Sequence, residues 1–146
     1  MRTLVITSLV ASLLVLIQGC AKPPKVSATM DITRKSNDIV WLMLRIKNLE
    51  DRATTPITPE VIVQTRTGAA WDKPVSQIHP AAFVLNKKEQ RDIFKVLHTN
   101  ADLIRGTLTI KEQENGHVLM TQRFEKAVPL SSQPATESHG VDEPHP

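Results

Sequence analysis

The sequence has one cysteine, and its five glycines are widely spaced among 146 residues. A single cysteine excludes an internal disulfide and a structural zinc site made of cysteine pairs, so packing alone must hold the core. The glycines at positions 19, 68, 106, 116 and 140 are too far apart for a loop that binds phosphate or a dinucleotide. The sequence therefore predicts no nucleotide site and no disulfide framework.

Catalytic patterns are missing as well. The chain has no Gly-x-Ser-x-Gly nucleophile elbow and no His-x-x-x-His pair, and its five histidines fall in expected turns or near the C-terminus. The acids Glu50 and Asp51 lie in an expected loop, and Glu112 and Glu114 flank a turn, where ordinary surface charge explains them. We expect a protein that is not an enzyme, with no catalytic residues, no metal site and no cofactor.

The chain carries a small positive charge, with a formal net charge of +3 and a sequence pI of about 9.2. The stretch after Val128 has acids but no lysine or arginine, so the rest of the chain is more basic than the whole. This bias is compatible with an anionic membrane surface or an acidic partner. There is no basic run or nucleic-acid motif, so we expect no nucleic acid as a partner.

The N-terminus has the pattern of a secretory signal. Arg2 precedes an apolar run from Leu4 to Ile17, which is followed by Gly19 and Cys20. A charged start, a short apolar segment and a small residue before a cleavage site are typical of a signal peptide. The run is shorter than the ~20 residues that span a bilayer, which disfavours a permanent membrane helix.

Gly19 and Cys20 resemble the lipobox of bacterial lipoprotein precursors, although Gln18 departs from the small or aliphatic residue usual there. The resemblance implies that residues 1–19 are removed, that Cys20 is acylated and anchors the protein in a membrane, and that residues 20–25 form a short tether. Ala21, in place of aspartate, resembles the outer-membrane sorting pattern. We therefore expect a lipoprotein of the outer membrane, on the periplasmic face rather than the cell surface.

Beyond the tether, apolar and polar residues alternate in short runs, which is typical of half-buried β-strands. Trp41 lies in a run that is apolar on both faces, so we expect this side chain in the core. Asn115 and Gly116 separate two alternating runs and predict a hairpin with a type I′ turn. No segment after residue 20 has convincing helical spacing. The expected strands cover residues 26–34, 39–48, 60–67, a short stretch near 75, 82–85, 90–97, 104–111 and 118–124.

These strands predict an all-β protein, an antiparallel immunoglobulin-like β-sandwich of about seven strands over residues 26–128. The apolar 83–85 segment, a charged turn and the strand from Gln90 also resemble immunoglobulin-like sandwiches of bacterial envelopes. Residues 129–146 are rich in proline, serine and acids and are expected to be a disordered acidic tail.

One predicted sheet face stands out as a candidate partner-binding surface. It is basic and rich in threonine, and Trp71 in a long loop is a separate candidate interface anchor. An ordinary solvated face is the competing interpretation. The candidate residues are Arg105, Thr107, Thr109, Lys111, Thr121, Arg123 and Trp71.

The resulting hypothesis is a membrane-anchored, non-catalytic protein-binding module, an accessory or assembly factor of an envelope complex such as a secretion, pilus or fibre system. The order of elements from Phe94 to Phe124 resembles the immunoglobulin-like periplasmic accessory proteins of curli assembly, which implies a fibre subunit as partner. Two alternatives stay open: a surface-facing exclusion or structural lipoprotein, and a metal-binding or hydrolytic sandwich protein.

Overall fold

The computed structural model describes residues 22–129 and contains eight antiparallel strands and no helix in that range. The predicted signal peptide, the lipidation site Cys20 and the predicted tail beyond Pro129 lie outside the described residues. The strands are β1 (Val26–Ser36), β2 (Ile39–Asn48), β3 (Ile57–Thr67), β4 (Ala70–Trp71), β5 (Val75–Ile78), β6 (Gln90–His98), β7 (Leu103–Glu112) and β8 (Val118–Ala127).

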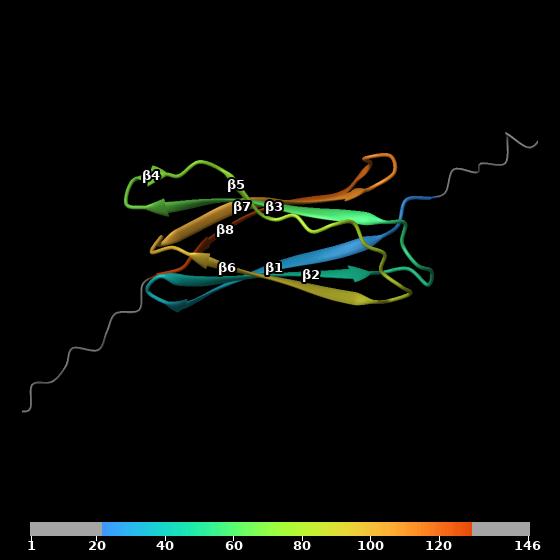
Figure 1. Cartoon of the computed structure of the whole chain (residues 1–146), viewed down its shortest axis with the longest axis horizontal. Coiled ribbons are helices and arrows are strands. Elements are labelled where there is room, and N and C mark those ends of the chain that lie inside the picture. Colours follow the sequence, from blue (N-terminus) through green and yellow to red (C-terminus); the bar gives the residue numbers. More distant parts are fainter. Residues whose placement is uncertain (1–21, 130–146) are drawn as a thin grey trace, which may run out of the picture.

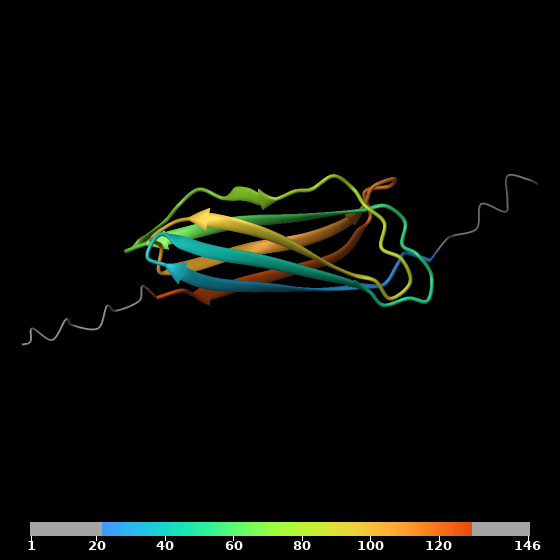
Figure 2. The same ribbon diagram turned by 60° about the horizontal axis from the view of Figure 1, so that its bottom comes forward.

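The strands form two sheets that stack face to face (Figure 1). One sheet has the order β1-β2-β6, and the other has the order β4-β3-β7-β8, with β5 also paired to β3. Strand β7 pairs along one side of β3. The two short strands β4 and β5 pair along its other side. The predicted antiparallel immunoglobulin-like sandwich is confirmed, and Figure 2 shows its sheets from a second side.

The core between the sheets is aliphatic. On β2, the alternate residues Val40, Leu42, Leu44 and Ile46 are fully buried and face the other sheet. Within residues 22–129, the buried side chains that form this core are isoleucine, leucine, valine and alanine, and none of them is aromatic. The prediction that Trp41 lies in the core is wrong, because the outer face of β2 has no second sheet over it and Trp41 is 40% exposed.

Strand β3 begins at Ile57, earlier than predicted, and includes Pro59. Ile57 and Phe83 exchange both backbone hydrogen bonds, at 2.9 and 3.0 Å. Every second residue of a strand points its backbone N–H to the same side of the strand. Position 59 therefore has the same direction as Ile57, towards the gap between Phe83 and β5, where no N–H donor is needed and proline is tolerated. The predicted strand at 82–85 is reduced to this single bridge.

The predicted hairpin between the last two strands is confirmed, but its turn is not type I′. Strand β7 ends at Glu112 and β8 begins at Val118, and of Asn115 and Gly116 only the glycine has a positive φ, at 67°. The backbone N–H of Gly116 donates to Glu112 O at 3.1 Å, and the Asn115 side chain accepts from the His117 N–H at 2.7 Å. These bonds close a longer loop, accompanied by a register shift at Ile110/Lys111.

Gly106, in the middle of β7, allows a close approach of its neighbours. A Cβ atom there would collide with the backbone oxygen of Ile62 and would lie 2.6 Å from the ring of Phe124. Glycine therefore lets the Phe124 ring lie against β7, where it packs on the edge of the core.

Candidate functional site

The sheet face predicted from the sequence exists on the outside of the five-stranded sheet. Thr107 pairs with Arg123 and Thr109 pairs with Thr121 across β7 and β8, and cross-strand partners share a face. Arg105 and Lys111 have the same parity on β7, opposite to the buried Leu108 and Ile110.

Trp71 reaches this face from β4, and two arginines hold it. The Arg105 guanidinium lies 4.0 Å from the centre of the indole ring and that of Arg66 lies 5.4 Å from it. Arg105 Nε also donates to Gln64 Oε1 at 3.0 Å. Trp71 is half-buried by these contacts, so it is less accessible to a partner than a free surface anchor would be.

Next to Arg105 lies a shallow hollow of about 620 Å³. The polar side chains that line it include Gln64, Thr107, Arg123 and Glu125. Elsewhere on the same face, Glu60 adds a second carboxylate, across from Thr109. The face is therefore polar and mixed in charge rather than basic throughout. Within residues 22–129, no three His, Cys, Asp or Glu side chains gather as a metal site would require. The hollow is suited to hydrogen bonding with a polar partner.

A second surface, which the sequence analysis missed, lies on the outside of the three-stranded sheet. Trp41 on β2 and Phe94 on β6 are 40% and 50% exposed and contact each other edge to face, with ring centroids 4.9 Å apart. Lys35 Nζ lies 4.3 Å from the centre of the Trp41 ring. Met43 and Val96, which pair with Phe94 and Trp41, complete what we name the aromatic patch.

A sequence signal for the aromatic patch did exist. Arg45 and Lys47 have the same parity as Trp41 on β2, whereas Val40, Leu42, Leu44 and Ile46 form the uninterrupted apolar face. Because charged residues are rarely buried, that parity identifies the solvent face of the strand. Giving more weight to the two charges would have placed Trp41 outside.

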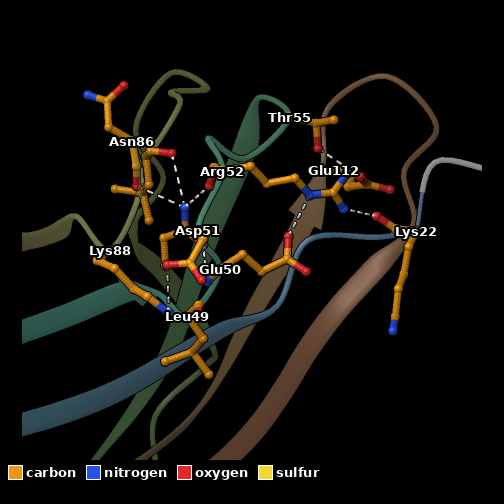
Figure 3. A network of polar contacts seen from close by, with 11 residues as sticks. Lys22, Leu49, Glu50, Asp51, Arg52, Thr55, Asn86, Lys88 and Glu112 are labelled. Atoms are coloured by element: carbon orange, nitrogen blue, oxygen red, sulfur yellow. Dashed lines mark hydrogen bonds and ion pairs between the residues drawn. The ribbon is translucent and has the colours of Figure 1, made fainter.

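One end of the sandwich is built from loops that a buried asparagine joins. We name residues 22–25, 49–56 and 82–89 the loop end. Asn48 is fully buried, and its Nδ2 donates to the carbonyls of Arg52 at 2.7 Å, Asn86 at 2.8 Å and Leu85 at 3.4 Å (Figure 3). Its Oδ1 accepts from the N–H of Glu50 at 2.9 Å. Asn48 therefore fixes the loop after β2 against the loop before β6.

The described part of the chain contains no helix that is long and apolar enough to cross a membrane. No protein-family model and no curated protein sequence matches the chain.

Several solved structures share its fold. One is a Bordetella pertussis protein assigned as ApaA, 16% identical, with a TM-score of 0.50, covering 74% of this chain and 97% of that chain. A domain of the outer membrane lipoprotein Omp28 from Porphyromonas gingivalis is 12% identical, with a TM-score of 0.52, covering 73% and 91%. At these identities the similarity shows the fold alone.

Proposed function

We propose that this protein is a lipoprotein anchored to the outer membrane through Cys20, and that its sandwich is a non-catalytic protein-binding module. It serves as an accessory or assembly factor of an envelope complex, on the periplasmic side. The N-terminal sequence pattern supports the anchor. The Omp28 protein, whose domain has the same fold, is an outer membrane lipoprotein, and the proposal extends that location to this chain.

The aromatic patch is the observation that carries the binding function. The chain has five aromatic residues, and two of them contact each other in solvent instead of filling the core. Tryptophan, phenylalanine, methionine and arginine are enriched where protein interfaces are fully buried, and a few such anchors supply most of the affinity. Trp41, Phe94 and Met43, with Arg45 beside them, have this composition.

The charges around the aromatic patch indicate the chemistry of the partner. Lys35 and Lys47 are exposed on the same face, and no carboxylate within residues 22–129 lies in ion-pair contact with them. Arg45 is paired to Asp92 at 3.3 Å. A protein segment with apolar side chains flanked by carboxylates would complement this surface.

The test compares the two sheet faces in cells. A photo-cross-linking amino acid is placed at Phe94 on the aromatic patch, at Thr109 on the five-stranded sheet, and at Glu114 in the loop between β7 and β8 as an exposed control on neither sheet face. We expect Phe94 to capture one partner reproducibly and Glu114 to capture none. Capture from Thr109 alone would move the docking surface to the Arg105 face, and capture from neither would contradict the binding module.

A substitution pair measures the strength of the contact once that partner is purified. Trp41→Ala with Phe94→Ala removes both anchors, and hot-spot anchors contribute at least ~2 kcal/mol each, so we expect affinity to fall by ~100-fold or more. Arg105→Ala with Arg123→Ala is the matched control on the other face and should leave affinity nearly unchanged. Calorimetric titration gives both values, and the reverse ranking would contradict the assignment of the aromatic patch.

A narrower form of the proposal makes a fibre subunit the partner, as the resemblance to curli accessory proteins implies. The purified protein should then delay thioflavin-detected polymerisation of an amyloid subunit at substoichiometric amounts. Absence of delay would exclude the fibre partner and leave the general binding role. Clipping of the domain by protease on intact cells would instead support the surface-facing exclusion role.

A further inference from the structure

The first described residues are tied to the loop end. Arg52 Nη2 donates to the carbonyl of Lys22 at 2.7 Å, and the N–H of Leu49 donates to the carbonyl of Lys25 at 2.9 Å. Pro24 between them is buried. The chain is thus bound to the domain from Lys22 onward, so residues 22–25 are part of the folded domain and not a free tether.

This attachment leaves almost no length between the domain and the proposed lipid. Lys22 is two residues from Cys20, and each residue spans at most ~3.6 Å when extended, so the link is about 7 Å long. The loop end contains Lys22, while β8 finishes at the opposite end of the sandwich (Figure 1). If Cys20 carries lipid, the loop end is the part of the domain nearest the bilayer.

The loop end is held rigid, so it presents a defined surface. Lys88 Nζ donates to the carbonyl of Leu49 at 2.6 Å, and the N–H of Lys88 donates to the carbonyl of Glu50 at 3.2 Å. Together with the Asn48 bonds, these contacts fix the segment from Leu49 to Arg52 against the segment from Leu85 to Glu89 (Figure 3). Leu49 nevertheless stays 44% exposed.

The surface chemistry fits an anionic bilayer. Each carboxylate of the loop end is already beside a cation: Glu50 with Arg52 at 2.9 Å, and Asp51 with Lys87 and Lys88 at 3.6 Å each. Glu89 contacts Arg91 at 3.6 Å. Lys22 and Lys25 have no such partner in the described part of the chain, and the N–H of Leu49 bonds to the backbone of Lys25, so positive charge is left over beside this exposed leucine. The β7–β8 loop at the same end of the sandwich adds Glu112 and Glu114, so the surplus is confined to the residues named as the loop end.

We propose that the loop end docks on the bilayer surface, with Leu49 at the headgroup level and Lys22 and Lys25 against anionic headgroups. An apolar side chain within a basic surface is the combination that binds an anionic membrane interface. The inference rests on the proposed anchor at Cys20. Docking by one end fixes the orientation of the sandwich: the strands run along the membrane normal, and both sheet faces point sideways into the periplasm.

The test uses the lipidated protein purified from membranes and reconstituted into phosphatidylcholine vesicles with and without phosphatidylglycerol. Cys20 is the only native cysteine, so its acylation leaves a cysteine introduced by Leu49→Cys as the single site for an environment-sensitive fluorophore. Asn37→Cys, in the turn between β1 and β2 at the other end, is the matched control. Nitroxide lipids labelled near the headgroup quench a fluorophore that reaches the membrane.

We expect quenching at position 49 to be about twofold or more above that at position 37, and to fall when phosphatidylglycerol is left out. Equal, weak quenching at both positions, with lipid on Cys20 confirmed by mass spectrometry, would overturn docking and leave the anchor intact. A Cys20 mass without lipid would overturn the anchor itself. If the fluorophore at position 49 is protected from a water-soluble quencher in cells but not in vesicles, a protein covers this surface, and docking on the bilayer would be overturned.

Discussion

At the scale of single residues, Arg34 joins three separate parts of the chain. Its guanidinium donates to the carbonyl of Val128 at 2.8 Å, and also to carbonyls of the β1–β2 turn and of the segment between β6 and β7. Five acceptors on one planar group need the fork geometry that only arginine has. The acceptors are the backbone oxygens of Ser36, Asn37, Thr99, Ala101 and Val128.

Substituting Arg34→Lys should therefore cost stability although the charge is kept. Lysine has three donors in a compact ammonium group, so several partly buried carbonyls would lose their partners, and we expect the free energy of unfolding to fall by ~1–3 kcal/mol. Urea unfolding followed by circular dichroism measures the change. Arg123→Lys, exposed on β8, is the control and should stay within ~0.5 kcal/mol of the wild type. Equal effects would show that the Arg34 contacts contribute nothing.

Glu112 makes stability depend on pH. The carboxylate of Glu112 accepts one hydrogen bond from the amide of Asn115, at 2.9 Å, and another from the hydroxyl of Thr55, at 2.7 Å. These bonds hold the pKa of Glu112 below its ordinary value of 4.5, although burial opposes them. A lowered pKa in the folded state contributes stability that is present above the pKa of the unfolded chain and is lost as pH falls through the folded value.

We expect the free energy of unfolding to decrease as the pH is lowered through the range below about 4.5, and Glu112→Gln to flatten that decrease. Urea titrations at a series of pH values provide the measurement. Glu114→Gln in the same loop is the matched control, since Glu114 is exposed, and it should keep the wild-type slope. The prediction fails if both variants have the same slope.

At the scale of strands, the sequence predicted the elements better than their ends. Strand β2 was predicted at its observed bounds, because a charged loop follows Asn48 and a polar turn precedes Ile39. Strand β3 was predicted to begin after the prolines, since proline cannot donate to a sheet, but Pro59 faces a gap in the edge. The two-residue strand β4 has no pattern of its own and follows from its pairing with β3.

For the candidate surfaces too, the sequence predicted some features, and others depend on the tertiary structure. Alternation along β7 and β8 correctly placed Arg105, Thr107 and Arg123 on one face, because the period of a strand fixes parity. The indole of Trp71 against Arg105 could not be predicted, since it depends on a long loop folding back along β3. The exposure of Phe94 depends equally on tertiary structure, because it requires knowing that β6 pairs with β2 and closes the smaller sheet.

Strand β6 is an edge of the three-stranded sheet, and Lys95 protects it. Lys95 pairs with the fully buried Leu42, so it has the parity of the inward face, yet it is exposed because the strand lies at the edge. A charge pointing inward on an edge strand discourages another strand from pairing there.

Replacing this lysine with an apolar residue should promote self-association. We expect Lys95→Val to increase the average mass in sedimentation experiments with rising protein concentration, relative to the wild type. Lys95→Arg keeps the charge and should behave as the wild type does. An unchanged mass for Lys95→Val would show that the β6 edge is protected by other means, such as its contact with β5.

At the scale of the whole molecule, the aliphatic core leaves both tryptophans of the chain on outer faces, one on each sheet. Trp41 is already 40% exposed, so a Trp71→Phe variant should emit at long wavelength and shift little when urea unfolds it. The circular dichroism signal should be lost in full over the same urea range. A large shift of the emission to longer wavelength on unfolding would contradict the exposed placement of Trp41.

The same placement gives the molecule one fluorescent reporter for each face. In a Trp71→Phe variant the remaining emission comes from Trp41 on β2, and in a Trp41→Phe variant it comes from Trp71 on β4. A partner that covers the three-stranded sheet would move the first spectrum to shorter wavelength and leave the second unchanged. Intrinsic emission can therefore distinguish which side of the sandwich is occupied without any added label.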